Sequence, residues 1–212
     1  MTHASATVEH AAFTLRWSFG VDDTPQGQAP TATLRYRVEA HEALYLSDRL
    51  WLTDRAGARI ADPAGVYRFV HGDTLRLVFD QAPWPSNVEL RKTFRPLYSR
   101  VAPREARERA ITVGLPVDEY SCFARGTDDP ATVEHVTRVT LVLGYRLRAT
   151  LERDADPPPG ESGEDAGYIV YDPTRLVSSV TLAPLPVRRR VGYVPRYAFP
   201  GEPPPGPRPD AP

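Results

Sequence analysis

A long alternation of apolar and other side chains near the middle of the chain constrains the fold more than any other sequence feature. Within residues 133–151, apolar side chains recur at every second position. They are Val139, Leu141, Leu143, Tyr145 and Leu147. An extended strand puts such side chains on one face, because successive side chains point to opposite sides. The other face starts half-apolar and ends with arginines, as in a strand that leaves a core. The run therefore predicts a central strand of an antiparallel sheet.

Shorter segments repeat this period along the rest of the chain. Residues 13–19 and 33–38 alternate apolar and polar side chains, and the turn formers of residues 20–30 separate them. Residues 66–70 and 75–79 flank a His-Gly-Asp turn, which predicts a hairpin. Further strand-like segments lie at residues 43–53, 88–101, 168–171 and 177–182.

Residues 101–117 are open to two interpretations. Residues 103–109 fit one helical turn, with oppositely charged side chains four positions apart. The alternation of Arg107, Arg109 and Ile111 fits a strand instead. The passage VAPREARERAITVGLPV also resembles the strand–turn–strand passages of immunoglobulin-like sandwiches. Together with the number of short strands, it predicts an all-β antiparallel sandwich, immunoglobulin-like or C2-like in architecture, with long loops.

The ends of the chain differ in composition from its middle. Residues 1–10 are mostly polar and predict a flexible leader, and residues 11–199 predict a single sandwich domain. Residues 154–167 are acidic and rich in proline and glycine, which predicts a mobile surface loop. Residues 200–212 hold so many prolines that they predict an extended or disordered tail.

Composition excludes several function classes. The 212 residues are 41% hydrophobic, enough for a core, and the net charge of -1 argues against nucleic acid as a partner. Lys92 is the only lysine among 26 basic residues, a bias typical of a GC-rich genome.

The single cysteine, Cys122, excludes an intramolecular disulfide, and the N-terminal residues lack a signal-peptide pattern, so we expect a cytoplasmic protein. We expect no transmembrane segment, although peripheral membrane contact stays open.

Known catalytic and cofactor motifs are missing. The five histidines show no metal-ligand spacing, so we expect neither a metal nor a cofactor. An enzyme would need a site assembled in space, for which Cys122, His135 and Tyr145 are the candidates. This interpretation ranks third among the hypotheses, and we lean toward a protein that is not an enzyme.

A ligand-binding module is the second hypothesis. The acidic pairs at residues 22–23 and 128–129 fall in turn-rich segments, where carboxylates bind calcium in C2-type modules. Trp51 and Trp84 are candidates for stacking on a sugar, because Trp51 is out of phase with its apolar neighbours and Trp84 stands between prolines.

The leading hypothesis is a non-enzymatic interaction or assembly protein. It would bind another protein, or copies of itself, through a strand edge and the C-terminal segment. That segment mixes the arginines and tyrosines that protein interfaces favour. The candidate interaction residues are Arg188, Arg189, Arg190, Tyr193, Arg196 and Tyr197. On this hypothesis we expect that removing all residues after Leu182 abolishes assembly and leaves the core folded.

Overall fold

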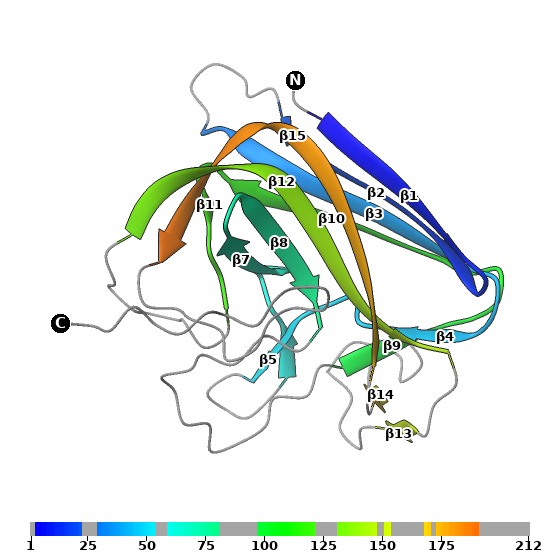
Figure 1. The fold of residues 1–212 in the computed structure, drawn as a ribbon. Coiled ribbons are helices and arrows are strands. Elements are labelled where there is room, and N and C mark those ends of the chain that lie inside the picture. The colour runs from blue at the N-terminus through cyan, green and yellow to red at the C-terminus, as the bar shows by residue number, and fades with distance from the viewer. Residues whose placement is uncertain are drawn as a thin grey trace, which may run out of the picture.

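Every regular element in the described part of the chain is a β-strand. The computed structural model describes residues 3–22, 29–53, 59–80, 97–121, 131–147, 151–153, 168–170 and 173–190. Their strands form two large sheets and a two-stranded sheet of β5 (Trp51–Thr53) and β6 (Arg59–Ala61) (Figure 1). The all-β class is therefore confirmed. Among these residues no helix has the length and apolarity needed to cross a membrane.

The first large sheet has four strands and is antiparallel throughout. Its order is β1-β2-β3-β10, formed by β1 (His3–His10), β2 (Phe13–Asp22), β3 (Thr31–Ala40) and β10 (Ala106–Gly114). The registers between these neighbours contain no shift. The strand interpretation of residues 106–114 is thus the correct one.

The prediction of a flexible leader is wrong for residues 3–10, which form β1. Every residue of β1 is in register with β2, from His3 opposite Gly20 to His10 opposite Phe13. Ala4, Ala6 and Val8 lie partly buried against the core. These small side chains make a weak sequence signal, and pairing with a strongly patterned neighbour makes up for it.

The second large sheet has nine strands and is mixed. It contains β4 (Leu44–Leu46), β7 (Tyr67–His71), β8 (Thr74–Phe79), β9 (Leu97–Val101), β11 (Val117–Asp118), β12 (Ala131–Arg146), β13 (Leu151–Arg153), β14 (Tyr168–Val170) and β15 (Thr174–Arg190). The predicted central strand is β12, and the predicted hairpin is β7 with β8. β12 pairs antiparallel with β15 on one side and parallel with β8 on the other, so this sheet is mixed and not antiparallel as predicted.

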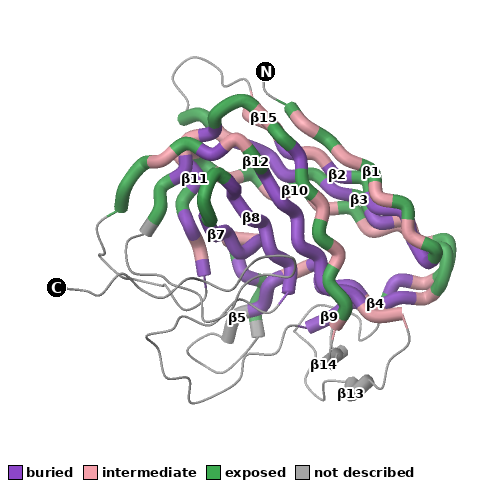
Figure 2. The backbone as a smooth tube through the Cα atoms, in the orientation of Figure 1, coloured by how far each residue is buried: buried purple, intermediate pink, exposed green. Residues whose placement is uncertain are grey.

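Side chains from both large sheets meet in one apolar core. The four-stranded sheet contributes residues such as Phe13 and Leu34, and the mixed sheet contributes residues such as Leu77 and Leu141. The Trp17 indole Nε1 donates a hydrogen bond of 2.9 Å to the Ser178 hydroxyl, which links β2 to β15. Figure 2 shows the buried stretches on β2, β8 and β12. Each large apolar side chain buried there contributes roughly 1.5–3 kcal/mol.

The mixed sheet is also buried on its other face. Val78 and Val142 lie there with Leu50, Tyr67 and Phe69 in a second apolar cluster. This explains why the second face of β12 is partly apolar.

Gly144 of β12 lies on this same face under a buried polar group. A Cβ atom at Gly144 would come within 2.8 Å of the Tyr98 hydroxyl and 3.0 Å of the Asp80 carboxylate. Tyr98 donates a hydrogen bond of 3.0 Å to Asp80, which also forms an ion pair with Arg175. Only glycine leaves room for this group beside the strand.

β15 continues through two prolines to Arg190. Its pairing with β12 shifts register opposite Val136 and Arg138, so residues 182–184 form a bulge that contains Pro184. A bulge needs no ladder hydrogen bond from this residue, and proline is therefore tolerated there. Leu185 and Val187, after the bulge, are buried in the core. A chain ending at Leu182 would lose both side chains, so that truncation cannot leave the core intact.

Candidate functional site

The edges of the sheets are the candidate site, because an edge presents backbone groups that a further strand can bind. Three described strands of eight or more residues have such an edge. β1 and β10 are the two ends of the four-stranded sheet. Among the described strands, β15 has β11 as its one partner on the outer side, through Val187 and Arg188. The three edges differ in the charges that lie beside them.

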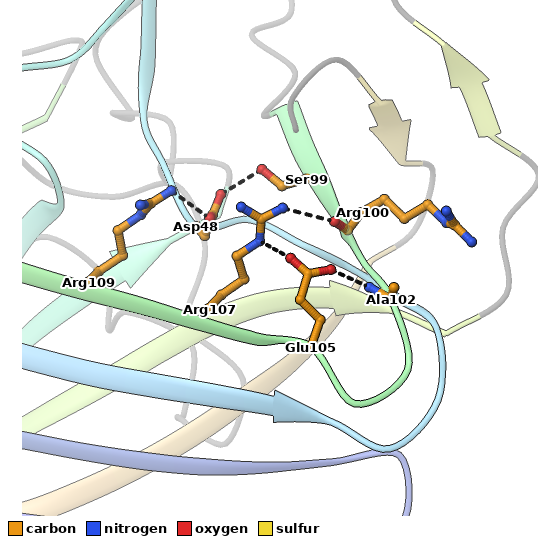
Figure 3. Close-up of polar contacts among 7 residues, drawn as sticks. All are labelled: Asp48, Ser99, Arg100, Ala102, Glu105, Arg107 and Arg109. Atoms are coloured by element: carbon orange, nitrogen blue, oxygen red, sulfur yellow. Dashed lines mark hydrogen bonds and ion pairs between the residues drawn. The ribbon is translucent and has the colours of Figure 1, made fainter. Parts of the chain in front are cut away.

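On β10, two arginines point toward the core. Arg107 lies in register with Val38, and Arg109 with Tyr36, both of which are core residues. Cross-strand partners share a face of the sheet, so the two arginines project toward the second sheet. Figure 3 shows them reaching from β10 toward Asp48 and Glu105.

Asp48, between β4 and β5, holds Arg109 in place. Its carboxylate is 2% exposed, and its Oδ2 lies 2.9 Å from the Arg109 guanidinium. The Ser99 hydroxyl of β9 donates a hydrogen bond of 2.8 Å to Oδ1. Both carboxylate oxygens therefore have a partner, which a buried charge requires.

The Tyr36 hydroxyl completes this buried group. It donates a hydrogen bond of 3.2 Å to the Asp48 backbone carbonyl. Burial, followed by the negative charge of Asp48, raises the pKa of Tyr36 well above its usual value. The phenol stays neutral and acts as a donor, so this group of side chains positions the backbone and presents no acid or base to solvent.

Arg107 is held by the turn before β10. Its Nε lies 3.1 Å from the Glu105 carboxylate, and its Nη2 donates a hydrogen bond of 3.3 Å to the Arg100 carbonyl. Glu105 also accepts a hydrogen bond of 2.8 Å from the Ala102 amide (Figure 3). Inward-pointing charges are a device by which natural sheets prevent an added strand from covering their edge. β10 is an edge of this protected kind.

The β1 edge has no such device. Its core-facing side chains are Ala4, Ala6, Val8 and His10, whose ring stacks on Phe13, and none of the four is an arginine, a lysine or a carboxylate. The strand is regular over its whole length and contains neither proline nor a bulge. A long, regular edge without inward charges is the type that accepts a further strand.

Two of the predicted arginines lie exposed on the third edge. Arg188 forms an ion pair of 3.0 Å with Asp118, and Arg189 one of 3.6 Å with Glu134. Such exposed pairs contribute about 0–1 kcal/mol each, so both side chains are available to a partner. Arg190 ends β15 opposite Ala131. Tyr193, Arg196 and Tyr197 lie outside the described residues.

Of the ligand and enzyme candidates, the structure describes Trp51, His135 and Tyr145. Trp51 is 8% exposed and packs against Leu97, which weighs against an open stacking platform. Trp84 and Cys122 lie outside the described residues. His135 is exposed, and Tyr145 is buried in the core beside His10 and Phe13.

Within the described ranges, no group of three or more histidine, cysteine, aspartate or glutamate residues could hold a metal ion. No family model, curated protein or solved structure matches this chain. The proposals that follow therefore rest on its own residues.

Proposed function

We propose that this protein is a non-enzymatic interaction or assembly protein. It binds through the β1 edge and the C-terminal segment rich in arginine, tyrosine and proline. The single observation that carries the proposal is the unprotected β1 edge in a sheet whose other edge is protected. We also infer an immunoglobulin-like or C2-like sandwich, because both large sheets share one core.

The β1 sequence favours a second copy of this chain as the partner. If two β1 strands pair antiparallel about Ala6, His3 lies opposite Glu9 of the other copy. Ser5 then lies opposite Thr7, and on the other face Ala6 lies opposite Ala6 and Ala4 opposite Val8. Residues of the same face stay opposite each other, so the four-stranded sheets join into one continuous sheet. Such a two-fold interface is self-complementary and closed.

The C-terminal segment would add a second contact. Arg188 and Arg189 are exposed, and among the described residues each is paired with a surface carboxylate. Arginine and tyrosine are enriched in protein interfaces, where the planar guanidinium exchanges one carboxylate for another at little cost. In this proposal Tyr193, Arg196 and Tyr197 belong to the same contact.

Light scattering on the full chain and two variants tests the proposal. Ala6→Lys puts an inward charge into β1, and Thr7→Lys puts the same charge on the outward face as a matched control. We expect a dimer for the full chain and for Thr7→Lys, and a monomer for Ala6→Lys. Thermal melting of each variant shows whether the monomer is folded.

A chain that ends at Arg190 tests the C-terminal contact. This version keeps all of β15, including the buried Leu185 and Val187. We expect the dimer of this shorter chain to dissociate at a higher protein concentration than the dimer of the full chain. A full chain that is monomeric at all concentrations, or a folded Ala6→Lys variant that remains dimeric, overturns the proposal.

A further inference from the structure

The outward face of the four-stranded sheet carries a hollow lined by arginines. Arg16 lies in register with Arg37, and Arg35 lies with Ser18 in the neighbouring row. The row of Arg35 continues on β1 with Ser5. Together these side chains line a hollow of about 590 Å³. Hollows of this size fit small-molecule ligands.

Two like charges face each other across this hollow. Directly opposite residues on antiparallel strands have Cβ atoms only about 4.5–5.5 Å apart, and like charges in such a pair are destabilising. Arg16 and Arg37 are such a pair. Arg35 lies diagonally next to Arg16 on the same face, which adds a third positive charge.

Carboxylates of the described residues neutralise only part of the positive charge of these three arginines. Arg37 forms an ion pair with Glu108 and lies 3.9 Å from Glu39. Neither Arg16 nor Arg35 has an ion pair with any described residue. The hollow therefore holds two exposed guanidinium groups whose charge no carboxylate of the described residues offsets.

We propose that this hollow binds a small polyanion through phosphate or carboxylate groups. The guanidinium groups of Arg16 and Arg35 would each donate paired hydrogen bonds to one anionic group, a geometry that suits both anions. The hydroxyls of Ser5 and Ser18 add donors beside them. The bound anion would also relieve the repulsion between Arg16 and Arg37. This site does not depend on the assembly function proposed above.

Isothermal titration calorimetry with pyrophosphate and, separately, with citrate tests the site on the full chain. The variant Arg16→Ala/Arg35→Ala removes the two unpaired arginines. The control Arg100→Ala/Arg138→Ala removes two exposed arginines elsewhere and changes the net charge equally. We expect saturable binding of at least one anion, weakened at least about tenfold in the first variant and unchanged in the control. Glu108→Gln should strengthen binding about two- to fivefold, because it removes the carboxylate beside the hollow.

Melting curves without anion give a second readout. The single variant Arg16→Ala should keep or slightly raise the melting temperature, because it removes a like-charge pair. Binding of pyrophosphate alone assigns the site to phosphate groups, and binding of citrate alone assigns it to carboxylates. Absence of saturable binding for both anions, or equal weakening in the control variant, overturns the proposal.

Discussion

β1 and β10 are the two edges of one sheet, yet their core-facing side chains differ in kind. β10 presents Arg107 and Arg109, each held by a carboxylate, where β1 presents alanine, valine and one histidine that stacks on Phe13. Both strands are regular and similar in length. Whether an edge can accept a further strand is therefore decided here by its inward side chains and not by the regularity or length of its backbone. The inward Arg109 of β10 requires a buried carboxylate, Asp48, and this carboxylate in turn needs hydrogen bonds from Ser99 and Arg109.

The largest expected effect comes from removing that carboxylate. Asp48→Ala leaves Arg109 facing the core without its partner, and Asp48 itself is almost fully buried. Loss of one member of a buried pair costs about 3 kcal/mol here, at the low end because Arg109 is 26% exposed. Urea unfolding measures this change. The control Asp118→Ala breaks an exposed pair and should change the free energy of unfolding by less than about 1 kcal/mol. Equal effects in the two variants would contradict the role given to Asp48.

An intermediate effect is expected when the charge on β10 is removed. Arg107→Val should unblock this edge and produce species larger than a dimer, with association about tenfold stronger at this edge. Glu108→Val is the matched control, because it adds the same side chain to the outward face and keeps both inward arginines. Analytical ultracentrifugation separates the species. If both variants associate alike, added apolar surface is the cause and the inward charge is not.

The smallest effect concerns the hydroxyl that supports Asp48. Tyr36→Phe removes the hydrogen bond to the Asp48 carbonyl and should cost about 1 kcal/mol at neutral pH. The raised pKa means that the folded chain keeps the phenol proton above the unfolded pKa of about 10. The stabilisation that comes from the neutral Tyr36 phenol is complete below about pH 10 and is lost as the pH rises from there toward the raised pKa of the folded chain. Phenylalanine has no proton to lose, so the free energy of unfolding of Tyr36→Phe should fall less at alkaline pH than that of the unchanged chain. Its alkaline unfolding should therefore begin at a higher pH than its stability at neutral pH alone would predict. An unchanged onset would mean that Tyr36 ionises as freely in the folded chain as in the unfolded one.

Sequence patterns predicted the interior strands better than the edges. β12 and the β7–β8 hairpin carry long apolar alternation, and both strands of the hairpin and most of the predicted central strand appear in the structure, although β12 ends at Arg146. β1 was missed because its core-facing residues include two alanines and a histidine, whose hydrophobic signal is weak. The strand pattern of Arg107, Arg109 and Ile111 indicated that all three share a face, which the register with β3 bears out.

Long-range partners could not be predicted from the pattern. Asp48 and Arg109 are 61 residues apart, and nothing local to either residue indicates their contact. The parallel pairing of β8 with β12 is equally invisible, because strand order depends on the path of the chain between them. The predicted strand-like segment stopped at residue 182, and the bulge in β15 explains how the strand continues through Pro184 and Pro186. The hollow with Arg16 and Arg35 arises from the pairing of β2 with β3, which fixes the neighbours of each arginine.

Amide hydrogen exchange at low and high protein concentration tests the difference between the two edges most directly. If β1 pairs with a second copy, its amides exchange more slowly as concentration rises, and those of β10 do not change. That result would show that the unprotected edge is the one in use. Exchange in β1 that is independent of concentration, or slowing in β10 of equal size, would contradict the account.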